Sequence, residues 1–351
     1  MFTFFKKHFY PSLAFLLLFA LVLFLVNPLH TFQSVEISPP EEPQLPQAQL
    51  DLEELAAFSR REKIQEHQLE VTIKVQNRGE RTASNISLEV PLLAHLDSPY
   101  LALHKEAYSL PPVQVLEEEM GSRRALFHLG NLAPEASATV TISYTLEASS
   151  LTGQPRLTLL SNRNLAPYLE PSEGIESDHP DIEAQVRKVI GETDSLEEKT
   201  RKIYAFVLDH MSYDAASPYR NQDALSALRH GSGVCEDYAA LFVALCRAAG
   251  IPARQVNGYA DPAATGEKWH LSPGQVYPLQ GYRHSWAEFY VEGKGWLPAD
   301  PSLDLYSSSY RFFGALPNPS HIPQNYLDKP LKVRFQGGQL AVTWSESLVG
   351  K

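Results

Sequence analysis

Residues 231–254 read GSGVCEDYAALFVALCRAAGIPAR and hold both cysteines of the 351-residue chain, Cys235 and Cys246. Apolar side chains recur here at three- and four-residue steps, which is the period of a helix buried along one face. A glycine then stands where a left-handed C-cap belongs, and Pro252 prevents the helix from continuing. The pattern predicts a helix over residues 234–249 with Cys235 in its first turn.

The two cysteines are too far apart along this helix to form a disulfide. Their eleven-residue spacing separates the Cα atoms by roughly 16 Å, whereas a disulfide needs them within about 7 Å. We therefore predict two free thiols. Cys246 lies well down the apolar face and is predicted to be a small buried hydrophobe.

Cys235 stands in a different chemical setting. The first turn of a helix has unpaired backbone N–H groups and the positive end of the helix dipole, which both favour a thiolate over a thiol. Gly231 and Gly233 would let the backbone approach a substrate closely. These features alone leave two alternatives equally open, a nucleophile and a buried structural thiol, and a partner base would decide between them.

A candidate base lies in residues 284–300, HSWAEFYVEGKGWLPAD, which alternate as two strands joined by the turn EGKG. Alternate residues from His284 to Tyr290, Trp286 among them, share one face. Asp300 follows His284 by sixteen residues, so a hairpin brings the two onto adjacent strands. Whether they share a face depends on the register. The alternative is an exposed hairpin that carries a histidine and an aspartate by chance.

A thiol, an imidazole and a carboxylate can together perform acyl transfer. The thiolate attacks an acyl carbon, the imidazolium protonates the leaving amine, and the carboxylate holds the ring in the useful tautomer. The motifs GVCEDYAALFVALCRAAGIPARQVNGY, HSWAEFYV and GWLPADPS resemble the transglutaminase-like superfamily of papain-related thiol enzymes, over roughly residues 180–301. A weaker likeness to bacterial members extends through RFFGALPNPSHIP and the last hairpin.

The resemblance implies a role for each of these residues. Cys235 would be the nucleophile, His284 the base and acid, and Asp300 the orienting carboxylate. The backbone N–H of Cys235 is expected to be one oxyanion donor. The second donor is predicted to be Tyr213 in MSYD, which could equally be a core tyrosine.

Trp286 and Trp296 are expected to pack around the site. The carboxylates in SDHPD and DPAATGEKWH are too sparse to indicate a calcium site. We therefore expect no metal and no cofactor.

The domain order is predicted from the periodicity along the chain. Residues 66–150 alternate as short strands and resemble an immunoglobulin-like β-sandwich. After a connector over 151–179, helices come first and strands follow over 180–351, which predicts an α+β catalytic domain that ends in a β-hairpin turning at Gly337-Gly338. The expected fold is thus a papain/transglutaminase-like core, with a helix-borne cysteine and an antiparallel sheet that carries the histidine and the aspartate, preceded by the sandwich.

The N-terminal segment differs from the rest of the chain. Residues 1–30 place Lys6 and Lys7 before an uncharged apolar run, which favours an uncleaved signal anchor, a transmembrane helix, over a cleaved signal peptide. The lysines would stay in the cytoplasm, so the catalytic domain would face outward from the cell membrane. Residues 31–65 are rich in proline and glutamate and are predicted to be an extended linker.

The predicted function is that of a membrane-anchored, outward-facing thiol enzyme. It would form an acyl-enzyme on Cys235 from amide bonds of a protein or peptide substrate. Water would resolve this intermediate in a protease or amidase, and an amine would resolve it in a cross-linking transglutaminase. The alternative is an inactive scaffold module that has kept the fold. The net charge of −11 argues against a nucleic-acid partner, and the oligomeric state is left open.

Overall fold

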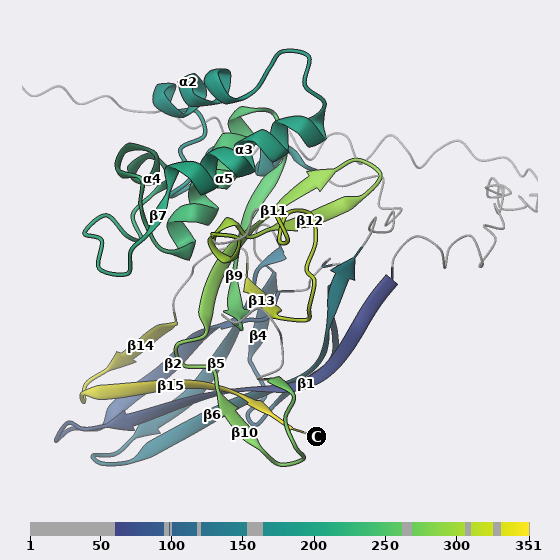
Figure 1. Ribbon diagram of the computed structural model, residues 1–351. Helices are drawn as coiled ribbons and strands as arrows, with labels where there is room; N and C mark the ends of the chain where they lie inside the picture. Colours follow the sequence, from purple (N-terminus) through teal and green to yellow (C-terminus); the bar gives the residue numbers. More distant parts are fainter. Residues whose placement is uncertain are drawn as a thin grey trace, which may run out of the picture. The chain divides into compact units, whose positions relative to one another are not determined.

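The structure, a computed structural model, describes the greater part of the chain after residue 59 (Figure 1). The described residues are 60–94, 98, 100–117, 121–152, 164–261, 269–305, 310–325 and 331–350. The predicted anchor (1–30) and nearly all of the predicted linker (31–65) lie outside them. Within these ranges, no helix combines the length and the apolar character needed to cross a membrane.

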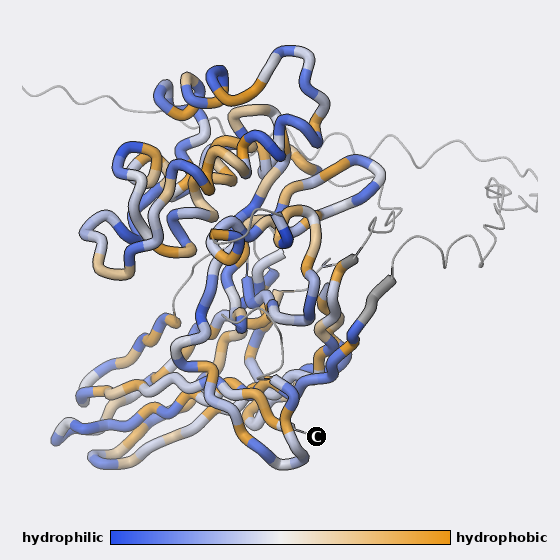
Figure 2. Tube along the Cα trace, viewed as in Figure 1, coloured by the Kyte–Doolittle hydropathy of each residue, from blue (hydrophilic) through white to orange (hydrophobic). Residues whose placement is uncertain are grey.

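Two antiparallel sheets share one hydrophobic core and form a β-sandwich. Their strand orders are β10-β15-β1-β6-β3 and β14-β2-β5-β4. Hydrophobic and hydrophilic residues alternate along these strands (Figure 2), so each strand turns one face to the shared core, as Val71 and Ile73 do. The bounds are β1 Arg60–Asn77, β2 Ala83–Leu92, β3 Leu101–Tyr108, β4 Gln114–Glu117, β5 Arg123–Leu132, β6 Ser137–Thr152, β10 Val276–Pro278, β14 Lys332–Gln336 and β15 Leu340–Val349.

The C-terminal strands form where they were predicted, but the predicted hairpin is wrong. β14 pairs with β2 in one sheet and β15 pairs with β1 in the other, so the chain crosses from sheet to sheet between them. Gly337 and Gly338 make this crossing in the left-handed conformation, with φ of 67° and 62°. The last two strands thus complete the sandwich instead of extending the α+β part of the chain. That the sandwich is immunoglobulin-like stays a prediction.

Among the described residues, four α-helices and a third antiparallel sheet form the α+β part of the chain. The sheet has the order β12-β11-β9-β13. Helix α5 packs against β9 and β11 and also contacts α2, α3 and α4 (Figure 1). The bounds are η2 Ala166–Tyr168, α2 Pro180–Val189, α3 Leu196–His210, β7 Ser212–Tyr213, α4 Ala224–His230, β8 Ser232–Gly233, α5 Cys235–Ala248, β9 Ala253–Ala260, β11 Arg283–Val291, β12 Gly295–Ala299, η4 Pro301–Leu303 and β13 His321–Asn325.

The helix predicted over 234–249 is α5, with Val234 as its N-cap. It is the central helix of this domain, because buried residues follow one another without a gap from Asp237 to Arg247. Apolar residues of β11 and β12, such as Phe289 and Leu297, belong to the same core cluster. This packing fixes the start of α5, and so Cys235, relative to the sheet.

Candidate active site

Cys235 is the first residue of α5, and its thiol is partly exposed. The carboxylate of Asp237 accepts a hydrogen bond from the backbone N–H of Val234 at 2.7 Å and so caps this helix start. Both cysteines are free, as predicted. Cys246 is fully buried, and burial holds the pKa of its thiol well above the ordinary value. Only Cys235 is therefore placed to react.

The two glycines before Cys235 have structural reasons of their own. Gly231 is the left-handed C-cap of α4, with φ of 60°. A Cβ at Gly233 would overlap the carboxylate of Asp237, so glycine is needed there for the capping contact. The short parallel pair of β7 and β8 then places Tyr213 opposite Gly233, beside the start of α5.

His284 and Asp300 lie within hydrogen-bond distance of each other, at the hairpin that the sequence predicted. The ring Nε2 of His284 lies 2.7 Å from Oδ2 of Asp300. β11 and β12 pair in the register Ala287 to Ala299, with the turn around Gly293. In this register Asp300 lies two residues from the position opposite His284, so both side chains stand on the same face of the sheet.

Charge and burial set the protonation of this pair. Burial lowers the pKa of His284, but the negative charge of Asp300 and hydrogen bonds to Asp300 and Cys235 outweigh it and raise this pKa to about 10. Burial likewise raises the pKa of Asp300, but the charge and hydrogen bond of His284 hold it below its ordinary value. The pair is therefore imidazolium and carboxylate at neutral pH. Since Nε2 faces Asp300, Nδ1 is the ring nitrogen left for Cys235.

Asp300 accepts further hydrogen bonds from donors that the sequence did not predict. Its Oδ1 accepts the hydroxyl of Ser302 at 2.7 Å and the backbone N–H of Leu303 at 3.2 Å. Its Oδ2 accepts a hydrogen bond from a second imidazole, through Nε2 of His321, at 3.0 Å. His321 begins β13 and is fully buried. It lies within RFFGALPNPSHIP, but no pattern there marks this histidine as a partner of Asp300.

Trp286 packs beside His284, and its supporting role in the site stays a prediction. Its ring is fully buried and lies parallel to that of His284, 6.1 Å away at an interplanar angle of 21°. Its Nε1 donates to the hydroxyl of Tyr100, which comes from the sandwich. Trp296 does not join this group: its ring contacts are with Tyr168, Tyr290 and the guanidinium of Arg254.

Tyr100 also links the site to a buried ion pair. Its hydroxyl donates to Glu288 at 2.6 Å, and the other carboxylate oxygen of Glu288 accepts from Nε of Arg254 at 2.8 Å. Both charged side chains are almost fully buried. Trp286 is therefore fixed through a hydroxyl that is itself fixed by a buried carboxylate.

We expect Glu288→Gln to destabilise the fold by about 3–5 kcal/mol, because it leaves the buried Arg254 without its carboxylate. Urea unfolding followed by tryptophan fluorescence measures this loss. Glu197→Gln is the matched control, since its ion pair with Arg201 is exposed on both sides and should contribute no more than about 0.5 kcal/mol. Equal losses for the two variants would contradict the structural role of the buried pair.

A cavity of about 330 Å³ opens over Cys235 and His284. Its lining is mostly aromatic and aliphatic, and Tyr213 is part of it, half-exposed. Burial and the nearby Cys235 and Asp300 raise the pKa of Tyr213, so its hydroxyl stays protonated and can donate. The structure thus brings together Cys235, His284, Asp300 and Tyr213 as predicted.

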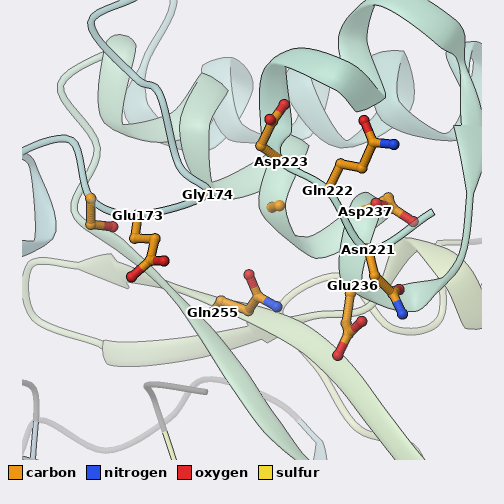
Figure 3. A pocket seen from close by; sticks show the side chains of 10 residues that line it. Glu173, Gly174, Asn221, Gln222, Asp223, Glu236, Asp237 and Gln255 are labelled. Carbon is orange, nitrogen blue, oxygen red and sulfur yellow. The ribbon is translucent and has the colours of Figure 1, made fainter. Parts of the chain in front are cut away.

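A second cavity, of about 360 Å³, contains no residue of this group (Figure 3). Figure 3 shows acidic and amide side chains around it, from the segment between η2 and α2, from the starts of α4 and α5, and from β9. Two of these acids already cap helices: Asp223 accepts from the N–H of Ser226 at 2.6 Å, and Asp237 caps α5. These two carboxylates therefore have structural roles of their own in this cavity.

Among the described residues, His284, Asp300 and His321 are the group whose side-chain atoms lie close enough to hold a metal ion, within 4.8 Å of one another. Their protonation does not suit a metal. His284 is an imidazolium, and both carboxylate oxygens of Asp300 already accept hydrogen bonds. The group is better described as a hydrogen-bonded cluster.

Comparison with known proteins bears on the same region. Residues 183–301 match the family model described as the transglutaminase-like superfamily. An uncharacterized protein of Haemophilus influenzae is 31% identical over 37% of this chain and 36% of its own length. A protein-glutamine gamma-glutamyltransferase of Pseudomonas aeruginosa is 42% identical over 21% of this chain and 10% of its own length. The chain thus spans little more than a third of these curated relatives at most.

A solved structure covers more of the chain. It is that of a candidate cysteine protease from Cytophaga hutchinsonii, which is 16% identical and has a TM-score of 0.47. The match covers 81% of this chain and 99% of that one.

Proposed function

We propose that this chain, whose residues 183–301 belong to the transglutaminase-like superfamily, is a thiol enzyme that forms an acyl-enzyme on Cys235 from amide bonds of proteins or peptides. The observation that carries the proposal is the meeting of a partly exposed thiol at a helix start with an imidazolium that is bound to a buried carboxylate. A scaffold module would have no need to keep a buried charged pair beside an open cavity.

The first half of the reaction forms a thioester. The Cys235 thiolate attacks the amide carbonyl carbon, and a tetrahedral oxyanion forms. As the C–N bond breaks, Nδ1–H of His284 gives its proton to the leaving nitrogen, and the amine departs. Asp300 holds the ring through Nε2 throughout and stabilises its charge.

The second half releases the acyl group. Water or a primary amine attacks the thioester carbon and gives a proton to Nδ1 of His284, while the C–S bond breaks and the thiolate returns. Water yields hydrolysis, and an amine yields a new amide and so a cross-link. Cys235 lines the cavity and is partly exposed, so water can reach it, and we favour hydrolysis with limited cross-linking where an amine enters.

Two donors suit the oxyanion. As the first helical residue, Cys235 has a backbone N–H without an acceptor in its own helix. The Tyr213 hydroxyl lines the same cavity and stays protonated, so it is the side-chain donor we propose.

We also propose that the enzyme is tethered to the cell membrane and faces outward. The support for this is the apolar run after Lys6 and Lys7. Protease treatment of intact cells should degrade an epitope tag placed after residue 350 and spare one placed before Lys6. The reverse pattern would overturn the orientation.

Alkylation tests the activated thiol directly. Iodoacetamide should modify Cys235 rapidly and at nearly the same rate at mildly acidic and neutral pH, because the imidazolium of His284 stabilises the thiolate across this range. The site is located by peptide mass mapping. His284→Ala should slow the reaction and make it rise with pH. If Cys235 reacts no faster than the thiol of a short peptide, the chain is the scaffold module instead.

Turnover is then read with two generic probes. Release of fluorescent peptides from labelled casein reports hydrolysis, and incorporation of a fluorescent primary amine into casein reports cross-linking.

A further inference from the structure

One carboxylate oxygen of Asp300, Oδ2, is hydrogen-bonded to two imidazole rings, those of His284 and His321. Of these two rings, only that of His284 faces Cys235. We propose that His321 is a positioning residue for the reaction at Cys235: as a neutral hydrogen-bond donor it keeps Asp300 ionised and aimed at His284. This inference rests on the proposed function and extends it by a residue that the Cys-His-Asp arrangement does not include.

The contacts of His321 account for both of its ring nitrogens. Nε2 lies 3.0 Å from Oδ2 of Asp300, and Nδ1 lies 3.0 Å from the hydroxyl oxygen of Ser320. The side chain is fully buried. Trp286 meets its ring edge-on at 4.9 Å, and Phe312 lies 5.9 Å away. Solvent therefore cannot replace either hydrogen bond.

The surroundings decide which protonation state His321 adopts. Burial lowers its pKa, while the charges of Asp300 and Asp261 raise it and that of His284 lowers it, and the net direction is down. The ring is therefore neutral. Because a carboxylate can only accept, Nε2 carries the proton, and Nδ1 accepts from the Ser320 hydroxyl.

A neutral donor has an advantage over a second cation at this position. A protonated His321 would compete with His284 for the single charge of Asp300 and repel the imidazolium 5.9 Å away. A neutral imidazole satisfies one lone pair of the carboxylate and leaves its full charge to His284. The two histidines on one carboxylate are thus unequal, and only His284 carries the proton that the reaction uses.

The sheet is built to allow this approach. His321 pairs with Ala260 of β9, and on the other side of β9 His284 pairs with Gly258. A Cβ on Gly258 would overlap the carbonyl oxygen of Ile322, so glycine is what lets β13 pass close enough. β9 thereby holds the two histidine strands at a fixed spacing around Asp300.

The test follows the ionisation of Asp300 in His321→Leu. Removing a hydrogen-bond donor from a carboxylate raises the pKa of that carboxylate. The rate of Cys235 alkylation by iodoacetamide is measured against pH, and the acid limb is the low-pH part of this profile, where the rate falls. In His321→Leu the acid limb should move to higher pH by about one to two units. His321→Gln, whose amide can donate to the same oxygen, should restore the wild-type limb. A purely structural role would lower thermal stability in both variants and leave the limb in place.

Two further variants keep the outcome decisive. Ser320→Ala removes the partner of Nδ1 and should move the limb in the same direction by less, and this variant decides the question if His321→Leu does not fold. His67→Leu is the matched control, because His67 is a buried histidine that packs edge-on against Trp269 in the sandwich. It should not move the limb.

The ¹³C resonance of the Asp300 carboxyl gives the same titration without any reaction at Cys235. If wild-type Cys235 proves unreactive while this resonance shifts in His321→Leu, the proposed function fails and the role of His321 toward Asp300 stands. A folded His321→Leu protein with an unmoved carboxyl titration overturns the inference.

Discussion

Cys235→Ala should abolish rapid alkylation and all turnover of labelled casein, with no residual acyl-enzyme. The reason is that no other described thiol can take its place. Cys246 lies eleven positions further along α5, is fully buried, and has a thiol whose pKa burial raises. Loss of the nucleophile removes the covalent route itself, so this is the largest effect we expect.

Cys246→Ala is the matched control for this change. It removes the other thiol from the same helix and should keep both the alkylation rate and turnover, at a cost of about 1 kcal/mol in stability for the small cavity. Mass mapping of the alkylated peptide measures both variants. Turnover that survives in Cys235→Ala would show that another group performs the chemistry.

Asp300→Asn should lower turnover by about three to four orders of magnitude while the protein stays folded. An asparagine carries no charge, so the main contribution that raises the pKa of His284 to about 10 disappears. The ring is then neutral at pH 7 and free to adopt the wrong tautomer. Alkylation of Cys235 should become slow and should rise with pH.

The same variant changes how stability depends on pH. The folded pKa of His284 lies above its ordinary value of 6.5, so its contribution to stability is fully present below pH 6.5 and is lost as the pH rises toward 10. Urea unfolding between these pH values should show this loss in the wild type and a flatter profile in Asp300→Asn.

Asp304→Asn is the matched control, because this buried carboxylate binds the hydroxyl of Tyr204 and the backbone N–H of Phe312. It should cost stability without changing the pH profile of alkylation. An equal effect of the two variants on alkylation would contradict the assignment of Asp300.

The parts of the site that could be predicted are those with a local signature. Helical spacing placed Cys235 at a helix start. The length of the hairpin placed His284 near Asp300, since any turn close to its midpoint brings them to adjacent strands. The register was the open point, and the pairing of Ala287 with Ala299 closes it.

The parts that could not be predicted depend on pairings between distant segments. His321 reaches Asp300 only because β13 adds to β9, and Tyr100 reaches Trp286 from the turn before β3, 186 residues away in sequence. The sequence around His321 and around Tyr100 shows no periodic pattern that would predict either contact. The predicted pairing of the two C-terminal strands was wrong for a related reason. A hairpin and a crossing between sheets both need a turn such as Gly337-Gly338. Which of the two forms depends on the edges that β1 and β2 offer for pairing, and these lie far away in the sequence.

The crossing of the last two strands has a consequence for how the protein is made. β15 pairs Leu340 with Asn77, so the strand order of the sandwich closes around residues that the ribosome adds long after Cys235, His284 and Asp300. A nascent chain therefore holds its three reactive groups while one sheet still lacks the strand between β1 and β10. Trp286, which stacks on His284, donates to the hydroxyl of Tyr100 directly before β3 of this sheet, so the sheet beside that contact is completed only late in synthesis.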